Sequence, residues 1–140
     1  MKIFNVRNAA ESDWAACQLF DAEIERDRLI GKIKASEIIV VENKGERIGY
    51  LRFEYLWSKF PFIALISVRQ GFRNQGVGRA LLSHLIELDR NEGKTFILSS
   101  SQSNESSPQS WHKHLGFLEI GSLNGINADG SAEIFYRLNT

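Results

Sequence analysis

Several features are scarce in this sequence. Its 140 residues include one cysteine, Cys17, two prolines and three histidines. A single cysteine excludes an intramolecular disulfide, and the histidines form no cluster at zinc-ligand spacing. Cys17 lies on the apolar side of a predicted helix, which favours a packed thiol over a nucleophile. We therefore expect no metal site.

Net charge and long apolar runs are also lacking. Seventeen basic residues balance seventeen acidic residues, so no overall field attracts a polyanion, and we expect no nucleic-acid partner. No apolar run approaches the roughly 18 to 20 residues that span a bilayer, and no apolar stretch of signal-peptide length follows the first residues. These absences predict a cytoplasmic protein without a membrane partner. The length predicts one domain, residues 1–140.

The spacing of apolar residues predicts a chain in which strands and helices alternate. The expected strands are residues 2–7, 37–42, 47–57, 62–68, 95–99, 117–123 and 133–138, and the expected helices are residues 13–24, 76–91 and 108–114. Residues 26–35 suit either a second short helix or a loop. Pro61 is expected to break the chain after the strand 47–57. This order indicates an α/β fold with a mixed (α+β) sheet, of about six to seven strands and about four helices.

The most specific feature is the segment 68–82, in which a buried strand runs through a glycine-containing turn into an amphipathic helix. The first N–H groups of a helix lack intrahelical acceptors and the helix dipole adds positive charge, so such a junction binds anions. Gly76 and Gly78 allow a phosphate to approach the backbone, and Arg73 and Arg79 add charge at its flanks. Tight packing alone also explains the glycines. The pattern is neither a Walker A loop nor a dinucleotide-binding fingerprint.

The same segment resembles a known family. Residues 73–78, Arg-Asn-Gln-Gly-Val-Gly, match the R/Q-x-x-G-x-G/A signature of the GNAT acetyltransferases, and ALISVRQGFRNQGVGRALLSHL is similar to their central strand and cofactor helix. The later QSWHKHLGF, residues 109–117, is similar to the second signature of the family. The two signatures stand in the expected order, and the predicted elements agree with the family's mixed sheet. The resemblance therefore covers essentially the whole chain.

The resemblance implies the acyl-CoA N-acyltransferase (GNAT) fold and a function. The acetyl group of acetyl-coenzyme A would pass to a primary amine, of a small molecule or a protein, by direct attack in a ternary complex. The implied cofactor-binding residues are Val68, Arg73, Asn74, Gln75, Gly76, Val77, Gly78, Arg79 and Asn104. Asn104 could instead cap the helix that follows it. We expect a monomer or a homodimer, and the amine acceptor is unidentified.

Two residues are candidates for proton transfer. Where the family usually has a Tyr as general acid, counting back from Gly116 places His112; an imidazolium can donate a proton near neutral pH, and a packing role is equally open. Glu54 is the best candidate to take the proton of the amine, although Arg52 on the same strand face could simply pair with it. Loss of the Tyr leaves one alternative function, an acyl-CoA-binding sensor without turnover.

Overall fold

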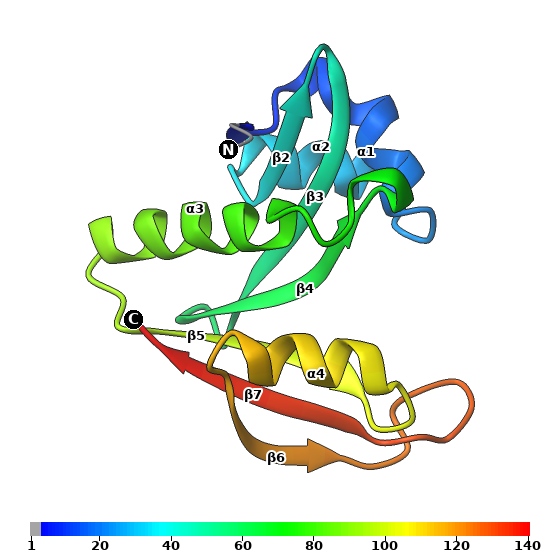
Figure 1. The fold of residues 1–140 in the computed structure, drawn as a ribbon, viewed down its shortest axis with the longest axis vertical. Coiled ribbons are helices and arrows are strands. Elements are labelled where there is room, and N and C mark those ends of the chain that lie inside the picture. Colours follow the sequence, from blue (N-terminus) through cyan, green and yellow to red (C-terminus); the bar gives the residue numbers. More distant parts are fainter. Residues whose placement is uncertain (1–3) are drawn as a thin grey trace. The chain divides into compact units, whose positions relative to one another are not determined.

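The computed structural model describes residues 4–140 (Figure 1). In this part of the chain, seven strands form a sheet in the order β1-β2-β3-β4-β5-β7-β6, and there are four α-helices. The β4–β5 pair is parallel, whereas the β1–β2, β2–β3, β5–β7 and β6–β7 pairs are antiparallel. The mixed sheet predicted from the sequence is confirmed. No helix among these residues is long and apolar enough to cross a membrane.

The chain divides into two compact units. The first comprises the residues up to Glu54 together with Ala64–Leu88, and the second comprises Tyr55–Ile63 and Asp89–Thr140. Three elements, β3, β4 and α3, contribute residues to both units. The units are described separately below.

The first unit contains the N-terminal elements. These are β1 (Asn5–Asn8), α1 (Trp14–Phe20), α2 (Arg26–Lys34), β2 (Ile38–Asn43), most of β3 (Glu46–Leu56), the second half of β4 (Phe60–Val68) and most of α3 (Val77–Asn91). A turn with positive φ at Lys44 (51°) and Gly45 (81°) joins β2 to β3. The strands predicted over residues 37–42 and 47–57 are therefore present and pair as an antiparallel hairpin.

The segment 26–35, which suited either helix or loop, forms α2, and the packing of its apolar residues against the core stabilises this helix. Leu29 and Ile33 are buried in one core cluster with Cys17 and Tyr50. None of the surface of Cys17 is exposed, and burial raises the pKa of its thiol to about 12. A thiol with this pKa stays protonated near neutral pH and is unreactive. The prediction that Cys17 is a packed core residue is confirmed.

The second unit contains the C-terminal elements. They are β5 (Phe96–Gln102), α4 (Ser106–His114), β6 (Leu118–Leu123) and β7 (Glu133–Asn139), together with the end of β3, the start of β4 and the end of α3. In β4, Phe62 and Ile63 pair with Leu98 and Ser99 of β5. The ring of Phe62 also stacks on Phe135 of β7, at 5.8 Å between centroids.

The break predicted at Pro61 was wrong, because Pro61 lies inside β4. Proline is tolerated in the first residues of a strand, where no ladder hydrogen bond from its nitrogen is needed. The chain reverses earlier instead. Trp57 and Ser58 both have positive φ, 53° and 58°, and the N–H of Lys59 donates to the carbonyl of Leu56 over 3.0 Å. This is the two-residue hairpin geometry, here without the usual glycine or asparagine.

Other differences concern the ends of elements. The helix predicted over residues 13–24 ends at Phe20, because Asp21 leaves the helical region with φ −135° and ψ 70°. The strand predicted over 95–99 continues to Gln102, as its second half pairs with β7. Residues 2 and 3 of the first predicted strand lie outside the described part of the chain, and the described strand β1 begins at Asn5.

Candidate active site

The glycine turn lies in the first unit and connects β4 to α3. Asn74 and Gly76 both have positive φ, 60° and 87°, which turns the backbone into the helix that begins at Val77. The N–H of Ala80 is the first to bond along the helix, to the carbonyl of Gly76 over 2.9 Å. The N–H groups of the three preceding helical residues, 77–79, therefore have no intrahelical acceptor. This turn has the backbone geometry of an anion site.

The two arginines of the turn are not neutralised by acids. Arg73 is exposed, and its Nε donates to the carbonyl oxygen of Val68 over 3.1 Å. Arg79 is exposed on the first turn of α3, and neither arginine has an ion pair with another described residue. Unpaired N–H groups, the helix dipole and two free guanidinium groups all favour negative charge. The residues present therefore fit a ligand with several phosphates.

The end of β4 also borders a cavity of about 460 Å³ in the first unit. Val68 and Arg73 line it from the β4–α3 side, and Leu19 and Phe20 line it from α1. Leu19 is 83% exposed and can therefore contact a ligand. The cavity therefore joins an apolar wall to the cationic turn, a combination that suits a ligand with both apolar and phosphate parts.

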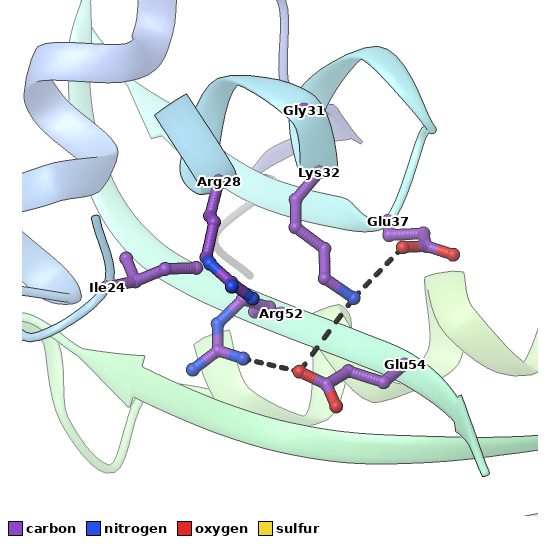
Figure 2. Close-up of a pocket in the computed structure, with 7 residues that line it drawn as sticks. All are labelled: Ile24, Arg28, Gly31, Lys32, Glu37, Arg52 and Glu54. Atoms are coloured by element: carbon purple, nitrogen blue, oxygen red, sulfur yellow. Dashed lines mark hydrogen bonds and ion pairs between the residues drawn. The ribbon is translucent and has the colours of Figure 1, made fainter. Parts of the chain in front are cut away.

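Glu54 lies at a second cavity of the first unit, about 400 Å³ in volume, between α2 and β3 (Figure 2). We call this the α2–β3 cavity; it is lined by Ile24, Arg28, Gly31, Lys32, Glu37, Arg52 and Glu54. The Oε1 atom of Glu54 accepts a hydrogen bond of 2.8 Å from Nη1 of Arg52, and Nζ of Lys32 lies 3.8 Å away. The pairing with Arg52 that the sequence allowed is present. The Glu54 side chain is still 44% exposed, so it can meet a ligand.

His112 belongs to the second unit, and only 3% of its surface is exposed. Its Nδ1 lies 2.6 Å from the carbonyl oxygen of Pro108, and its Nε2 lies 2.7 Å from the hydroxyl oxygen of Ser99. A carbonyl oxygen only accepts, so we assign the proton to Nδ1, and Nε2 of the neutral ring then accepts the Ser99 hydroxyl hydrogen. The ring also stacks on Tyr136, with 4.2 Å between centroids.

The protonation state of His112 bears on its predicted role. Burial lowers the pKa of its ring from the ordinary value of 6.5, and the bond to Pro108 and the charge of Glu133 only partly offset this. The neutral ring is therefore favoured at neutral pH. A general acid has to be the imidazolium, whose Nε2 carries the second proton. His112 as a general acid stays a prediction. It requires the imidazolium, whereas burial favours the neutral ring.

Asn104 lies in the exposed turn between β5 and α4, also in the second unit. Its Nδ2 donates to Oδ2 of Asp129 over 3.0 Å. The N-cap position of α4 is Glu105, whose side chain makes no capping hydrogen bond. The structure thus assigns a surface contact to Asn104, and its binding to the cofactor stays a prediction.

Sequence reasoning missed three residues that shape the α2–β3 cavity. Arg28 and Lys32 come from α2, a segment whose conformation the sequence left open. Asp21 holds Arg52 in place, with its Oδ2 accepting a hydrogen bond of 2.7 Å from Nε of Arg52. Only the spacing of Arg28 and Lys32, four positions apart on one helix face, could have indicated the first two.

A family model described as the Acetyltransferase (GNAT) family matches residues 4–117 of this chain. The chain belongs to the GNAT acetyltransferase family. The matched region contains the glycine turn and the second signature, so the resemblance found in the sequence is confirmed. GNAT acetyltransferases use acetyl-coenzyme A as cosubstrate, and at the level of the family the predicted cosubstrate is confirmed as well.

Solved structures show the same fold at low sequence identity. Ard1 from Thermoplasma volcanium is 16% identical, with a TM-score of 0.87 over 98% of this chain and 97% of that one. The putative acetyltransferase yncA from Salmonella typhimurium, solved with acetyl-CoA, is 20% identical, with a TM-score of 0.84 over 99% and 94%. A ribosomal-protein-alanine N-acetyltransferase from Brucella melitensis is 19% identical, with a TM-score of 0.82 over 97% and 99%. No curated protein sequence matched the chain. The predicted GNAT fold is confirmed.

Proposed function

We propose that this GNAT protein is an N-acetyltransferase that transfers the acetyl group of acetyl-coenzyme A to a primary amine in a ternary complex. The observation that carries the proposal is the turn before α3. It combines helix N–H groups that have no intrahelical acceptor with two guanidinium groups, Arg73 and Arg79, that no described acid neutralises. Residues 1–140 would act as a single acetyltransferase domain.

The turn would hold the pyrophosphate of coenzyme A. Backbone N–H groups of residues 74–79 would bind its oxygens, while the side chains of Arg73 and Arg79 would balance its charge. The carbonyl of Val68 now accepts from Arg73. If Arg73 moved to a phosphate, it would free this carbonyl for the pantetheine arm. Asn104 is proposed as a further contact of the cofactor.

The reaction needs one bond to form and one to break. The neutral amine attacks the thioester carbonyl carbon, the new C–N bond forms, and the C–S bond breaks with its electron pair on sulfur. The amine nitrogen loses one proton and the thiolate gains one, so the products are the N-acetylamine and coenzyme A. Because an alkylamine is mostly protonated at neutral pH, a group that takes its proton accelerates the step.

Glu54 and His112 are our proposed groups for these proton transfers. Glu54 would take the proton of the amine, directly or through a water molecule, because its carboxylate is partly exposed at the α2–β3 cavity. His112 would return a proton to the thiolate, which requires its imidazolium form. Substitution of Glu54 or of His112 tests each proposed proton transfer separately.

Incubation of the protein with acetyl-coenzyme A and a panel of primary amines tests the proposal. Release of free thiol that depends on both the amine and the protein, with the acetylated amine detected by mass spectrometry, is the expected result. Coenzyme A binding by calorimetry is measured alongside. Binding without turnover on any amine would favour the acyl-CoA sensor, and absence of binding would refute the assignment of the turn.

A further inference from the structure

The α2–β3 cavity has an uneven set of charges. Three cations, Arg28, Lys32 and Arg52, line it together with two carboxylates, Glu37 and Glu54. Figure 2 shows Arg28 and Lys32 extending from α2 toward β3, where Arg52 and Glu54 lie. Which of these charges already have partners decides what the cavity can bind.

Two of the cations are neutralised by strong pairs. Nζ of Lys32 lies 3.0 Å from Oε1 of Glu37. Nε of Arg52 lies 2.7 Å from Oδ2 of Asp21, a residue that is 5% exposed. If Lys32 is counted with Glu37 and Arg52 with Asp21, one negative and one positive charge remain at the cavity. The negative charge is Glu54, which shares Arg52 with Asp21 through its own hydrogen bond of 2.8 Å, and the positive charge is Arg28.

Arg26 and Lys34, the basic residues on either side of this part of α2, have partners, whereas Arg28 has none among residues 4–140. Arg26 lies over the ring of Trp14, 4.2 Å from its centroid, and Lys34 lies 3.6 Å from Glu11. Arg28 has no hydrogen bond or ion pair with any residue from 4 to 140. A guanidinium group presents a planar fork of donors that matches a carboxylate. Its free fork at the cavity therefore indicates a ligand with a carboxylate.

We propose that the acceptor is a free amino acid, whose amine lies at Glu54 and whose carboxylate is bound by Arg28. This inference rests on the proposed acetyltransferase function. A zwitterion supplies one charge of each sign, and these complement the two charges that the internal pairs leave over. The volume of about 400 Å³ is within the usual range for small-molecule sites.

The same charges disfavour a protein N-terminus as acceptor. In a polypeptide, the carboxyl group next to the terminal amine is a neutral amide, which offers Arg28 no charge. The arginine would then lose hydration without gaining an ion pair. Arg28 thus acts as a specificity residue that separates free amino acids from peptides.

The test compares L-amino acids with their C-terminal amides as acceptors for the intact protein. We expect kcat/KM to be at least about tenfold higher for the acids. The amine of an amide is less basic, so more of it is deprotonated at neutral pH. This difference favours the amides and works against the expected result, which makes the comparison strict.

Substitution of Arg28 supplies the second arm. Arg28→Gln should raise KM for amino acids by about 10- to 100-fold and leave kcat/KM for their amides within about twofold. Arg28→Lys should recover part of the loss, since it keeps the charge but not the fork. Lys34→Gln is the matched control, because it removes one positive charge from the same helix at a distance from the cavity lining, and it should change neither value.

The outcomes separate this inference from the proposed function. Amides or amidated peptides acetylated as well as amino acids, with no effect of Arg28→Gln, would overturn the inference and leave the acetyltransferase intact. If no amine is acetylated, binding of amino acids to the coenzyme A complex is measured by calorimetry. Binding that Arg28→Gln abolishes supports the carboxylate site without turnover, whereas absence of binding overturns it.

Discussion

The Nε atom of Arg52 donates a hydrogen bond of 2.7 Å to Oδ2 of Asp21, and the two residues lie 31 positions apart in the sequence. The same oxygen accepts a bond of 2.6 Å from the hydroxyl of Tyr50. Burial and this bond raise the pKa of Tyr50 above its ordinary value, so its hydroxyl stays a donor. The buried carboxylate of Asp21 thus orders two side chains of β3, Tyr50 and Arg52. Arg52 in turn donates a hydrogen bond to Glu54.

Asp21→Asn should therefore destabilise the protein and release Arg52 from its fixed position in the lining of the α2–β3 cavity. The substitution leaves Arg52 without its buried counter-charge, and we expect a loss of about 2–4 kcal/mol in the free energy of unfolding. Urea unfolding measures it. Glu23→Gln, which removes an exposed carboxylate three residues from α1, is the control and should change stability by under about 0.5 kcal/mol. An equally small loss for Asp21→Asn would contradict this account.

The turn before α3 should control the affinity for coenzyme A. Gly78→Glu places a carboxylate where a phosphate is proposed to bind, so we expect the dissociation constant to rise by at least about a hundredfold. Arg73→Gln and Arg79→Gln should each raise it by about tenfold. Calorimetry with coenzyme A measures all three.

The control for these variants is Arg90→Gln, at the opposite end of α3. It removes the same charge from the same helix and should leave the affinity for coenzyme A unchanged. Circular dichroism checks that each variant is folded. Wild-type affinity in folded Gly78→Glu would show that the phosphates bind elsewhere.

His112→Phe tests the proposed general acid. A positioned acid contributes about a hundredfold to ten-thousandfold, so kcat should fall by that order while the affinity for acetyl-coenzyme A is kept. His112→Tyr should recover part of the rate. Ser99→Ala is the control, because it removes the Nε2 contact but leaves the ring. Turnover of His112→Phe within threefold of the parent would restrict His112 to packing.

The pH dependence gives an independent check on His112. Because burial lowers its pKa below 6.5, the imidazolium is lost as the pH rises through a value under 6.5. If His112 is the acid, kcat should fall over that range, and the fall should be absent in His112→Tyr. A kcat that is constant between about pH 5 and 7 would exclude the imidazolium as the proton donor.

Asp89 should make stability fall as the pH rises. It is 1% exposed, neither carboxylate oxygen has a hydrogen-bond partner among the described residues, and burial raises its pKa from 3.8 to about 6. The folded state therefore binds the proton more tightly than the unfolded chain. The stability that protonated Asp89 contributes is fully present below about pH 4 and is lost as the pH rises through about 6, a change of at most about 3 kcal/mol.

Asp89→Asn should remove this dependence and raise stability at pH 7.5 by about 1–3 kcal/mol. Thermal unfolding at pH 5 and pH 7.5 measures the difference. Glu87→Gln, at an exposed position on the same helix, is the control and should behave like the parent. A parent protein that is as stable at pH 7.5 as at pH 5 would show that Asp89 is solvated.

The sequence predicted those parts of the site that consecutive residues build. The turn from Arg73 to Arg79 could be assigned as an anion site because its N–H groups, its glycines and its charges all lie within seven positions. The helix after it was visible in the spacing of Leu81 and Leu85, which are fully buried. The conformation of the segment 26–35 was not visible, since short charged segments depend on their packing.

By itself, the sequence determined the family, the order of strands and helices, and the anion-binding turn, because these depend on local spacing and on backbone groups that every residue carries. Only the tertiary structure decided which charges are free. It paired Arg52 with Asp21 and Lys32 with Glu37, left Arg28 without a partner among residues 4–140, and buried His112 against Ser99. The physical reason is that the charge state and availability of a side chain depend on neighbours that the fold brings together from distant positions.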